Sequence, residues 1–470
     1  MDSILYWNDV TLEADRTTHT NRDVAEREAQ GPIGASRSIG MVHLAMHDAF
    51  FAINRKYDCY LPDLPEAPEG ADADAAVAAA AHATLSALYP TQKAFFNARH
   101  AAQGLAPGSD TTDGHFFGLK VAEALLARRA NDPSVSDDGY SFLPVQPHHQ
   151  PDPDNPGQGF HAPHFGDRAN LFAATTRHRI AAPPQPGSRD YERALRQVRS
   201  KGIAPALSGT LPAELLPTRT GAETAVGLFW AYDGAKGLGT PPRLYNQIIR
   251  QVAAAQRNDI VDNARLFALV NTAMADAGIL AWAEKYRHDL WRPVVGIRAH
   301  DSLNTGRPSG PSQGDPNWLP LGAPNSNNVG QRNFTPPFPA YPSGHATFGA
   351  AAFQSVRRFY RETRPVSDNL ADGLEFVSEE LNGVTVDNVG TVRPRLVRRF
   401  PDGLWQMIIE NGFSRVFLGV HWVFDAFAVD DTGKPDLRKN IGGVRLGLAI
   451  ADDIAANGLN ADAAAGPEPH

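Results

Sequence analysis

Residues 264–290 read ARLFALVNTAMADAGILAWAEKYRHDL, and this stretch decides the fold class. Its apolar residues recur every three or four positions, the period that places side chains on one stripe of an α-helix. The stripe consists of Leu266, Leu269, Val270, Ala273, Ala277, Ile279 and Leu280. The stretch therefore predicts a long, strongly apolar helix around which other elements can pack.

Helix-period segments also dominate the rest of the chain. They lie at residues 36–56, 72–88, 111–129, 191–201, 245–255, 345–362, 403–418 and 443–457. Alternating patterns typical of strands are scarce, and residues 384–392 are the best candidate for a short strand pair. We expect an all-α protein with helical-bundle architecture: two four-helix bundles packed together, with long Pro/Gly-rich loops and little β structure.

Two long stretches, residues 143–187 and 302–341, are rich in Pro, Gly and polar residues and are interpreted as loops. Loops of this length inside a compact domain are usually functional. The second lies between two motifs described below, so we expect it to build one wall of a site. No clean domain boundary is visible. We expect one large helical domain over residues 1–470, with a catalytic half at about 230–457 and a disordered tail at about 460–470.

Composition limits the possible partners and compartments. Of the 470 residues, 42% are hydrophobic and 20% are charged, values typical of a globular protein with a large core. A net charge of −8 argues against broad binding to nucleic acids or to anionic membranes. No signal-peptide pattern or uninterrupted membrane-length apolar run is visible. We expect a soluble protein, cytoplasmic by the absence of a signal, with secretion by another route left open. The single cysteine, Cys59, excludes an intrachain disulfide.

The first chemical motif is Lys285 followed, after six residues, by Arg292-Pro293. On a continuous helix, residues seven apart lie close to one face, so both cations can reach one pocket. Pro293 disfavours the helical conformation of the residue before it, so we expect the helix to end at Arg292. An arginine there can present its planar fork of donors to an anion. The alternative is an exposed lysine and arginine.

The second motif is Pro342-Ser343-Gly344-His345, directly before an alanine-rich apolar segment. Ser343 or Gly344 would lie near the N-cap of a helix, whose free amides and positive dipole end attract an anion. Glycine lets the backbone approach that anion closely. His345, on the first turn, can act as a general acid or base. The alternative is a serine-capped helix with an incidental histidine.

The third motif is Ser414-Arg415, followed by His421 and Asp425. Gly419 lies between the two halves, and a helix break there would help Arg415 and His421 to converge. A carboxylate four residues after a histidine can orient its imidazole. His421 could then be a nucleophile or a metal ligand. The alternative is a buried His–Asp pair in a core helix.

Together the motifs supply three permanent cations, two histidines, a hydroxyl and a glycine amide. These groups can hold a compact tetrahedral oxyanion, whose buried charge must be paired, and can move protons on it. The motifs leave open whether the oxyanion is hydrolysed or serves an oxidation. A non-catalytic oxyanion-binding protein is a third possibility.

In this order and spacing, the motifs resemble the signature of the family that unites vanadium-dependent haloperoxidases with class A acid phosphatases and type 2 phosphatidic acid phosphatases. That signature is Lys-x6-Arg-Pro, then Pro-Ser-Gly-His, then Ser-Arg-x5-His-x3-Asp. Within the family, the chain looks most like the fungal vanadium chloroperoxidases. Further matches lie at residues 4–8, 41–49, 230–234, 239–243, 276–279, 338–341 and 378–383. The resemblance covers most of the chain, apart from insertions, deletions and a shorter C-terminus.

The resemblance implies orthovanadate, with vanadium at +5, as the cofactor. His421 would be the one protein ligand to vanadium. The groups that would bind the vanadate oxygens are Lys285, Arg292, Arg415, Ser343 and the Gly344 amide. Asp233 matches an aspartate that pairs with the second arginine, here Arg415. Trp282 and Phe338 match aromatic residues beside the halide site.

The resemblance also implies the reaction. Hydrogen peroxide, with His345 taking its proton and Lys285 polarising it, would oxidise chloride or bromide to hypohalous acid, which halogenates an organic acceptor. Phe338 leans towards chloride, because bromide-selective relatives carry histidine there. The alternative is an acid phosphatase in which His421 attacks phosphorus to form a phosphohistidine and His345 protonates the leaving group. The sequence does not specify the acceptor, the oligomeric state or whether hypohalous acid is released.

Six other histidines are candidate metal ligands. His43 and His47 have helical spacing, but the face they share is otherwise apolar, which favours packing over metal binding. Four histidines in the first long loop are interpreted as solvated side chains rather than as a surface metal site: His148, His149, His161 and His164.

Overall fold

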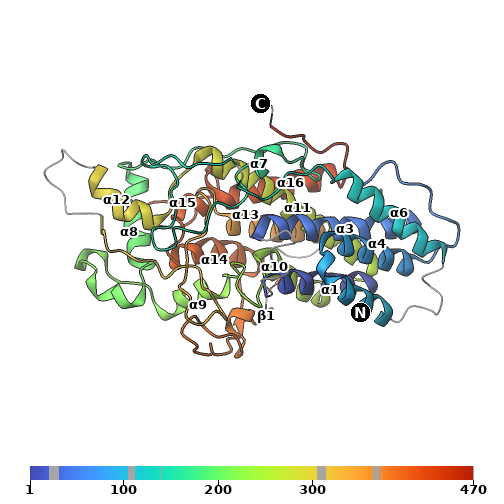
Figure 1. Cartoon of the computed structure of the whole chain (residues 1–470), viewed down its shortest axis with the longest axis horizontal. Helices are drawn as coiled ribbons and strands as arrows, with labels where there is room; N and C mark the ends of the chain where they lie inside the picture. Colours follow the sequence, from blue (N-terminus) through green and yellow to red (C-terminus); the bar gives the residue numbers. More distant parts are fainter. Residues whose placement is uncertain are drawn as a thin grey trace.

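The computed structural model describes residues 1–20, 31–103, 112–137, 139–303, 314–363, 370–371 and 373–468. The molecule is elongated, and many of its helices run along the long axis (Figure 1). The N-terminal helices, drawn in blue, gather at one end of the molecule. The all-α prediction is therefore confirmed.

The α-helices carry the labels of Figure 1. They are α1 (Ser3–Thr18), α3 (Gly31–Asn54), α4 (Ala73–Leu88), α5 (Lys93–Ala102), α6 (Asp113–Arg128), α7 (Phe165–Arg168), α8 (Arg189–Lys201), α9 (Gly221–Phe229), α10 (Pro241–Ala255), α11 (Ile260–His288), α12 (Pro293–Leu303), α13 (Gly344–Thr363), α14 (Gly403–Phe417), α15 (Val423–Ala426) and α16 (Gly442–Asn457). Short 3-10 turns lie at Pro90–Gln92, Pro205–Thr210, Ala213–Leu215 and Glu379–Leu381.

Strand structure is limited to short pairings in the described part of the chain. β1 (Glu375–Phe376) pairs antiparallel with β2 (Arg398–Arg399). Within the predicted strand pair at residues 384–392, a single antiparallel bridge joins Val386 to Val392. Little β structure was expected, and this prediction is confirmed.

Six of these helices were not predicted from the sequence: α1, α5, α7, α9, α12 and α15. Helix α1 shows why. Asp2 caps its start by accepting a hydrogen bond from the Leu5 amide at 2.9 Å. Its buried face includes Asn8, Thr11 and Asp15, so the helix lacks a clean apolar stripe. Periodicity of hydrophobic residues cannot detect a helix whose buried side is partly polar.

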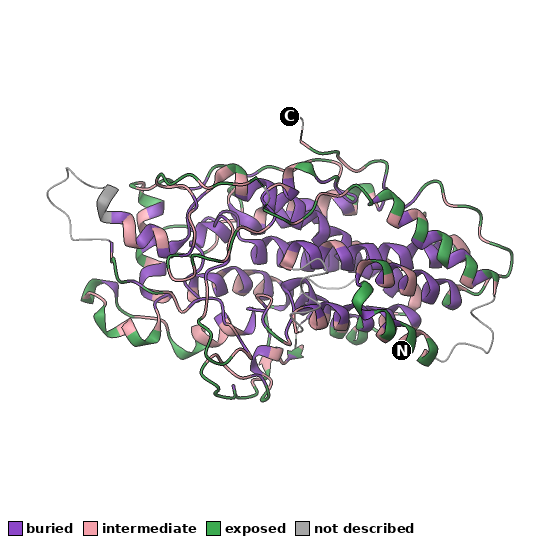
Figure 2. Ribbon diagram, in the orientation of Figure 1, coloured by how far each residue is buried: buried purple, intermediate pink, exposed green. Residues whose placement is uncertain are grey.

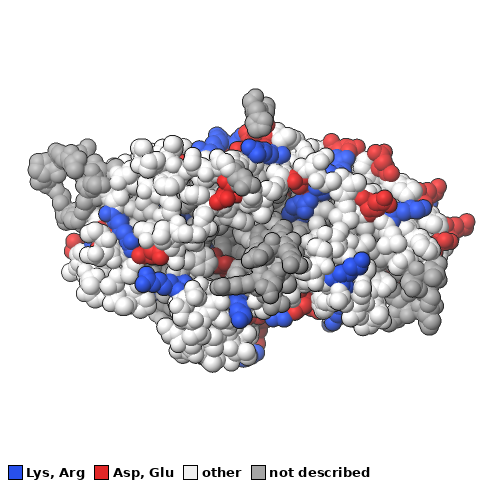
Figure 3. Space-filling model, viewed as in Figure 1, with Lys and Arg blue, Asp and Glu red and all other residues white. Residues whose placement is uncertain are grey.

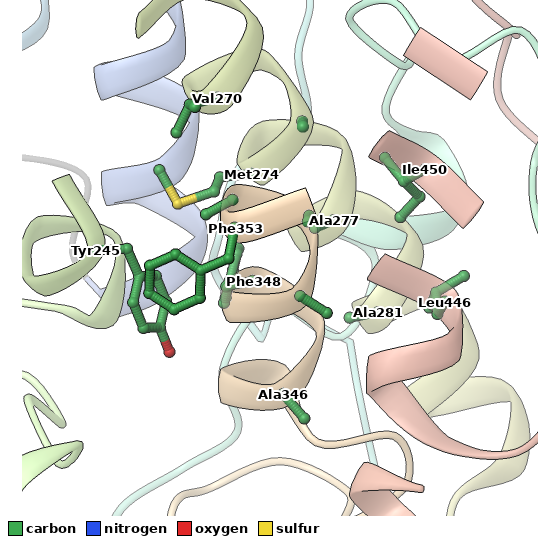
Figure 4. Close-up of a cluster of buried hydrophobic side chains, with 14 of the residues drawn as sticks. Tyr245, Val270, Met274, Ala277, Ala281, Ala346, Phe348, Phe353, Leu446 and Ile450 are labelled. Atoms are coloured by element: carbon green, nitrogen blue, oxygen red, sulfur yellow. The ribbon is translucent and has the colours of Figure 1, made fainter. Parts of the chain in front are cut away.

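Helix α11 is the centre of the packing. It packs against α3 and also against α13, which in turn packs against α16. Figure 4 shows apolar side chains of α10, α11, α13 and α16, including Met274, Phe353 and Leu446, gathered around α13. Figure 2 shows the same central helices almost entirely buried. The strongly apolar stripe predicted for this segment is therefore the core of the molecule.

Small residues allow α16 to lie close to α13. A Cβ added to Gly447 would lie 2.3 Å from the carbonyl oxygen of Thr347, and one added to Gly443 would lie 2.5 Å from that of Ser343. Real Cβ atoms do not approach backbone oxygen so closely. Glycine at these positions therefore permits the close contact that supports the start of α13.

Helix α11 has the length and hydropathy of a membrane-spanning helix, but 94% of its apolar window is buried inside the fold. It is therefore a core helix of the fold. On the face drawn in Figure 3, acidic and basic side chains are scattered among uncharged residues.

The C-terminal segment follows the surface back over the N-terminal helices and the first long loop. Backbone amides of Ala461, Ala465 and Glu468 donate to carbonyls of Tyr60, Ala174 and Asp167 at 2.9–3.0 Å. These contacts lie in the segment where the sequence predicted a disordered tail from about residue 460.

Candidate active site

The first cation of the site lies at the end of α11. Lys285 lies on the last turn of this helix, fully buried, and its Nζ donates to the carbonyls of Pro339 and Ala340 at 2.8 and 3.2 Å. Those carbonyls belong to the second long loop. Phe334 and Phe338 of the same loop line the cavity described below, so the expectation that this loop builds one wall is confirmed.

Arg292 does not lie on α11, and the predicted helix end is wrong. The helix ends at His288, where Asp289 adopts a left-handed conformation with φ of 47°, and Pro293 is the first residue of α12. The Arg292 Nε donates to the Phe338 carbonyl at 2.8 Å. Its Nη1 donates to the Val420 carbonyl at 2.8 Å and to His421 Nε2 at 2.9 Å. The short link between the helices thus brings the guanidinium to His421.

The second motif begins α13 as predicted. The helix starts at Gly344, and the Ser343 hydroxyl accepts from the Ala346 amide at 3.4 Å. The Ser343 amide itself donates to the carbonyl of Asp425 at 2.8 Å, which ties this motif to the third one. A Cβ on Gly344 would approach the Trp282 ring to 3.2 Å, so glycine suits this crowded helix end.

His345, on the first turn of α13, lies beside an ion pair. Its Nε2 donates to the Ala231 carbonyl at 2.6 Å and lies 3.8 Å from Asp233 Oδ1. The two oxygens of Asp233 accept from the two terminal nitrogens of Arg415 at 2.7 and 3.0 Å. The pairing of Asp233 with Arg415, expected from the resemblance, is present in the structure. Because Nε2 carries the proton, Nδ1 is the nitrogen of the neutral ring with a free lone pair.

The break in the third motif is also present. Arg415 lies on the last turn of α14, which ends at Phe417, and Gly419 follows with φ of +75°. His421 lies in the link to α15, and its Nδ1 contacts Asp425 Oδ2 at 2.8 Å. Arg292 can only donate, so His421 Nε2 is an acceptor and the ring proton resides on Nδ1.

Four of these residues line one cavity of ≈ 320 Å³, whereas Lys285, Arg292 and Ser343 lie next to lining residues without lining it themselves. Gly344, His345, Arg415 and His421 line it, together with Asp233 and the two expected aromatic residues. The rings of Trp282 and Phe338 lie 4.7 Å apart, centroid to centroid. Beneath Phe338 lie Lys285 Nζ, 5.0 Å from its centroid, and Arg292 Cζ, 4.9 Å from it.

The charges at this cavity are unbalanced. Among the described residues, Arg292 Nη2 and Arg415 Nε are buried without a hydrogen-bond partner. Burial and, second, the charge of Arg292 hold the pKa of Lys285 well below its usual value. Burial also lowers the pKa of Arg292 to about 9. Unpaired cationic donors enclosed around one cavity fit an oxyanion, which would supply the missing acceptors and charge.

Comparison with known proteins agrees with this geometry. Family models match residues 1–160 as the vanadium chloroperoxidase N-terminal domain and residues 265–435 as the second helical-bundle domain of that family. The chain is 39% identical to vanadium chloroperoxidase of Curvularia inaequalis, over 97% of this chain and 90% of that protein. The chain belongs to the vanadium chloroperoxidase family.

Solved structures of bacterial proteins share the fold of this family member. A vanadium-dependent iodoperoxidase aligns over 96% of this chain and 95% of its own, with a TM-score of 0.66 and 18% identity. A holo-type vanadium-dependent chloroperoxidase aligns over 94% of this chain and 95% of its own, with a TM-score of 0.60 and 18% identity.

The imidazole of His421 is held neutral and in a fixed orientation by its neighbours. Burial, followed by the charges of Arg292 and Lys285, holds its pKa well below the usual value, so the ring is neutral. Burial raises the pKa of Asp425 to about 7, against the opposing effect of Lys285. Asp425 also accepts from the Trp422 amide at 3.0 Å, which fixes the carboxylate that orients the imidazole.

Two histidines of the first long loop are not solvated as predicted. His149 is buried, with neither ring nitrogen hydrogen-bonded among the described residues, and His161 lines the cavity. The interpretation of these two histidines as solvated is therefore wrong. His148 pairs with Asp289 at 2.8 Å and is partly exposed. Loop histidines show no periodic pattern, and their partners lie far away in the sequence, so no sequence signal identified them.

The two helical histidines pack as predicted. His43 Nδ1 donates to the Ile39 carbonyl at 2.8 Å, and its Nε2 contacts the Asn8 amide at 2.9 Å. His47 contacts Asp48 at 2.9 Å and Arg265 at 3.1 Å. Both rings are buried in the fold.

Proposed function

We propose that this family member is a vanadate-dependent haloperoxidase that uses hydrogen peroxide to oxidise chloride or bromide to hypohalous acid. One observation carries the proposal: Arg415 and the oriented imidazole of His421 line a single cavity, and the buried cations Lys285 and Arg292 lie directly beside its lining residues. Residues from about 230 to 457 contribute the catalytic half of what we take to be one helical domain.

The residues present would hold vanadate in two ways: by hydrogen bonds to its oxygens and by one bond from a protein nitrogen to vanadium. Its oxygens would accept from Lys285, Arg292, Arg415, Ser343 and the Gly344 amide. Vanadium would bind Nε2 of His421 in place of the hydrogen bond that this nitrogen accepts from Arg292. Bound vanadate supplies a Lewis acid that activates peroxide for attack by halide without a change in the metal's oxidation state. The unpaired atoms Arg292 Nη2 and Arg415 Nε support this assignment, because both are buried donors that lack an acceptor among the described residues.

His345 would move the proton of peroxide. Burial, followed by the charge of Arg415, lowers the pKa of His345 to about 3 in the anion-free protein, so the ring is neutral. An oxyanion beside it would offset the positive charges and make Nδ1 a better base. Asp233 holds Arg415 and lies near His345, so it positions both groups.

The aromatic pair Trp282 and Phe338 would border the halide. Their rings form an apolar surface beside the cavity, above the charges of Lys285 and Arg292. A partly dehydrated halide would be attracted by those charges while the rings limit access of water. Either chloride or bromide would be a substrate, and phenylalanine at position 338 favours chloride. Hypohalous acid would then halogenate an organic acceptor.

The direct test is a halogenation assay of purified protein with hydrogen peroxide and chloride or bromide, with and without added orthovanadate. We expect halogenation that depends on vanadate. Activity independent of vanadate would contradict the proposal. Turnover of phosphate esters without halogenation would instead support an acid phosphatase that uses the same oxyanion cavity.

Two variants separate the roles of the histidines. His421→Ala should abolish tight vanadate binding and halogenation together, because no other imidazole lies at that position. His345→Ala should keep vanadate bound and reduce turnover by about 100-fold, the usual loss for a general acid–base group. Vanadate titration and halogenation rates are measured on both proteins. Full peroxidase activity of His421→Ala would show that the ligand is assigned wrongly.

A further inference from the structure

A third ring lies against the aromatic pair at the cavity. The imidazole centroid of His161 is 6.0 Å from that of Trp282, with the planes nearly perpendicular at 84°. It is 6.1 Å from the centroid of Phe338. With the 4.7 Å between Trp282 and Phe338, the three rings form a small triangle, and all three residues line the cavity.

The backbone of His161 is tied to both partners in this triangle. Its amide donates to the carbonyl of Pro337 at 3.0 Å, next to Phe338. Its carbonyl accepts from Trp282 Nε1 at 3.1 Å and from the Tyr286 hydroxyl at 2.8 Å. The position of the ring is therefore set by the same elements that set the two aromatic residues.

The imidazole itself makes no hydrogen bond to the described residues, and its Nε2 is enclosed. One edge of the ring packs on the start of α3, where a Cβ on Gly31 would lie 2.7 Å from Nε2. Burial and, second, the nearby His19 lower the pKa of His161 to about 4. The ring is thus neutral at pH 7 and carries one N–H donor beside an otherwise aromatic surface.

A halide in such a place needs a donor. Aromatic rings displace water from the anion, and the nearest cations, Lys285 Nζ and Arg292 Cζ, lie 5.0 and 4.9 Å from the centroid of Phe338. We propose that His161 is a halide-binding residue, whose imidazole N–H donates to the halide held between it, Trp282 and Phe338. This inference rests on the proposed haloperoxidase function and adds a third residue, from a different segment of the chain, to its halide site.

Kinetics of the vanadate-loaded enzyme test the role of the N–H. His161→Leu keeps a similar volume without a donor, and we expect the KM for chloride to rise about tenfold, the effect of one lost hydrogen bond to a charged group. Iodide is less strongly hydrated and depends less on hydrogen bonds, so its KM should rise less. The KM for peroxide should stay within about twofold, because the vanadate-binding groups are unchanged.

Two polar variants and a control complete the kinetic series. His161→Asn and His161→Gln place an amide N–H near the position of Nδ1 or of Nε2. In at least one of them, the KM for chloride should return most of the way to the wild-type value. His164→Leu, three residues along the same loop and outside the cavity lining, should behave as wild type. An unchanged chloride KM in His161→Leu, or a parallel rise for peroxide in all three variants, would overturn the inference.

Bromide-soaked crystals of the vanadate-loaded protein give a readout independent of turnover. Anomalous scattering should place bromide among the three rings in the wild type and show it depleted in His161→Leu. An active wild-type enzyme with no bromide beside His161 would refute only this inference. Bromide at this place in a protein without vanadate-dependent halogenation would refute the proposed function and leave the halide site standing.

Discussion

Asp233 determines how Arg415 can act, because it is the carboxylate that both terminal nitrogens of this buried arginine contact. The pair leaves Nε of Arg415 free of partners among the described residues, available to an oxyanion. Asp233 therefore neutralises the charge of Arg415 and also fixes the direction of its guanidinium group.

Replacing Asp233 with alanine should lower both stability and activity. Breaking a buried ion pair by removing one partner costs about 3 kcal/mol, because the other charge remains buried and unpaired. Urea denaturation of Asp233→Ala should show this loss, and halogenation should fall because Arg415 and His345 lose their common neighbour. Asp63→Ala removes an exposed carboxylate and serves as the control. Equal stability of the two variants would contradict the role of the pair.

At this scale, spacing within the three motifs pointed to the cations and histidines of the candidate site, whereas Asp233, Trp282 and Phe338 were identified only through the family resemblance. Each motif holds its residues within a few positions, so local structure fixes their relative placement once the chain folds. His161 escaped prediction because its contact with Trp282 joins positions 121 residues apart. Such a contact depends on how a long loop crosses the helix end, and no local pattern encodes it.

At the scale of elements, the sequence predicted most of the helices that the structure describes, but it misplaced some of their ends. The break at Gly419 was predicted because glycine allows positive φ. The end of α11 was misplaced by four residues, because Asp289 adopts the left-handed conformation that glycine usually supplies. Helix α1 was missed because its buried face carries polar groups that form hydrogen bonds in the core.

Position 419, where the helix breaks, should accept no residue other than glycine without a loss of stability. A Cβ there would lie 2.5 Å from the carbonyl oxygen of Gly202 and 2.9 Å from Cβ of Pro320. Gly433 has a similar φ of +82° but no neighbour within 4 Å, so Gly433→Ala should cost only about 1 kcal/mol of conformational strain. Gly419→Ala should cost about 3 kcal/mol or more in urea denaturation, and it should weaken vanadate binding by displacing His421. Equal losses in the two variants would show that crowding is unimportant.

The packing of α1 against α3 should make stability depend on pH. Burial lowers the pKa of His43 to about 4, and its Nε2 accepts from Asn8, an arrangement that protonation would disrupt. The unfolded chain binds this proton near pH 6.5 and the folded chain does not, so stability is complete above pH 6.5 and is lost as the pH falls towards 4. The full effect is about 3 kcal/mol. The free energy of unfolding, measured at pH 7 and 4.5, should change less in His43→Gln; an identical change would exclude His43 as the cause.

At the scale of the whole molecule, the oxyanion site joins elements that are distant in the sequence. Lys285 comes from α11, Arg292 from the link to α12, His345 from α13, and Arg415 and His421 from α14 and the residues after it. Helix α11 also packs against α3 of the N-terminal half, so it connects the site to both ends of the molecule. We therefore expect a ligand at the site to stabilise contacts in both halves of the fold.

This connection predicts that vanadate stabilises the whole protein. A ligand at 100 times its Kd adds about 2.7 kcal/mol to the free energy of unfolding, and the thermal midpoint should rise with vanadate concentration. Phosphate has a similar shape but forms no bond to His421 Nε2, so it should stabilise less through the cations alone. In His421→Ala, the effect of vanadate should fall to that of phosphate, as measured by thermal unfolding with each anion. A vanadate effect equal in wild type and variant would mean that the imidazole does not bind the metal, and the cations alone would then account for the site.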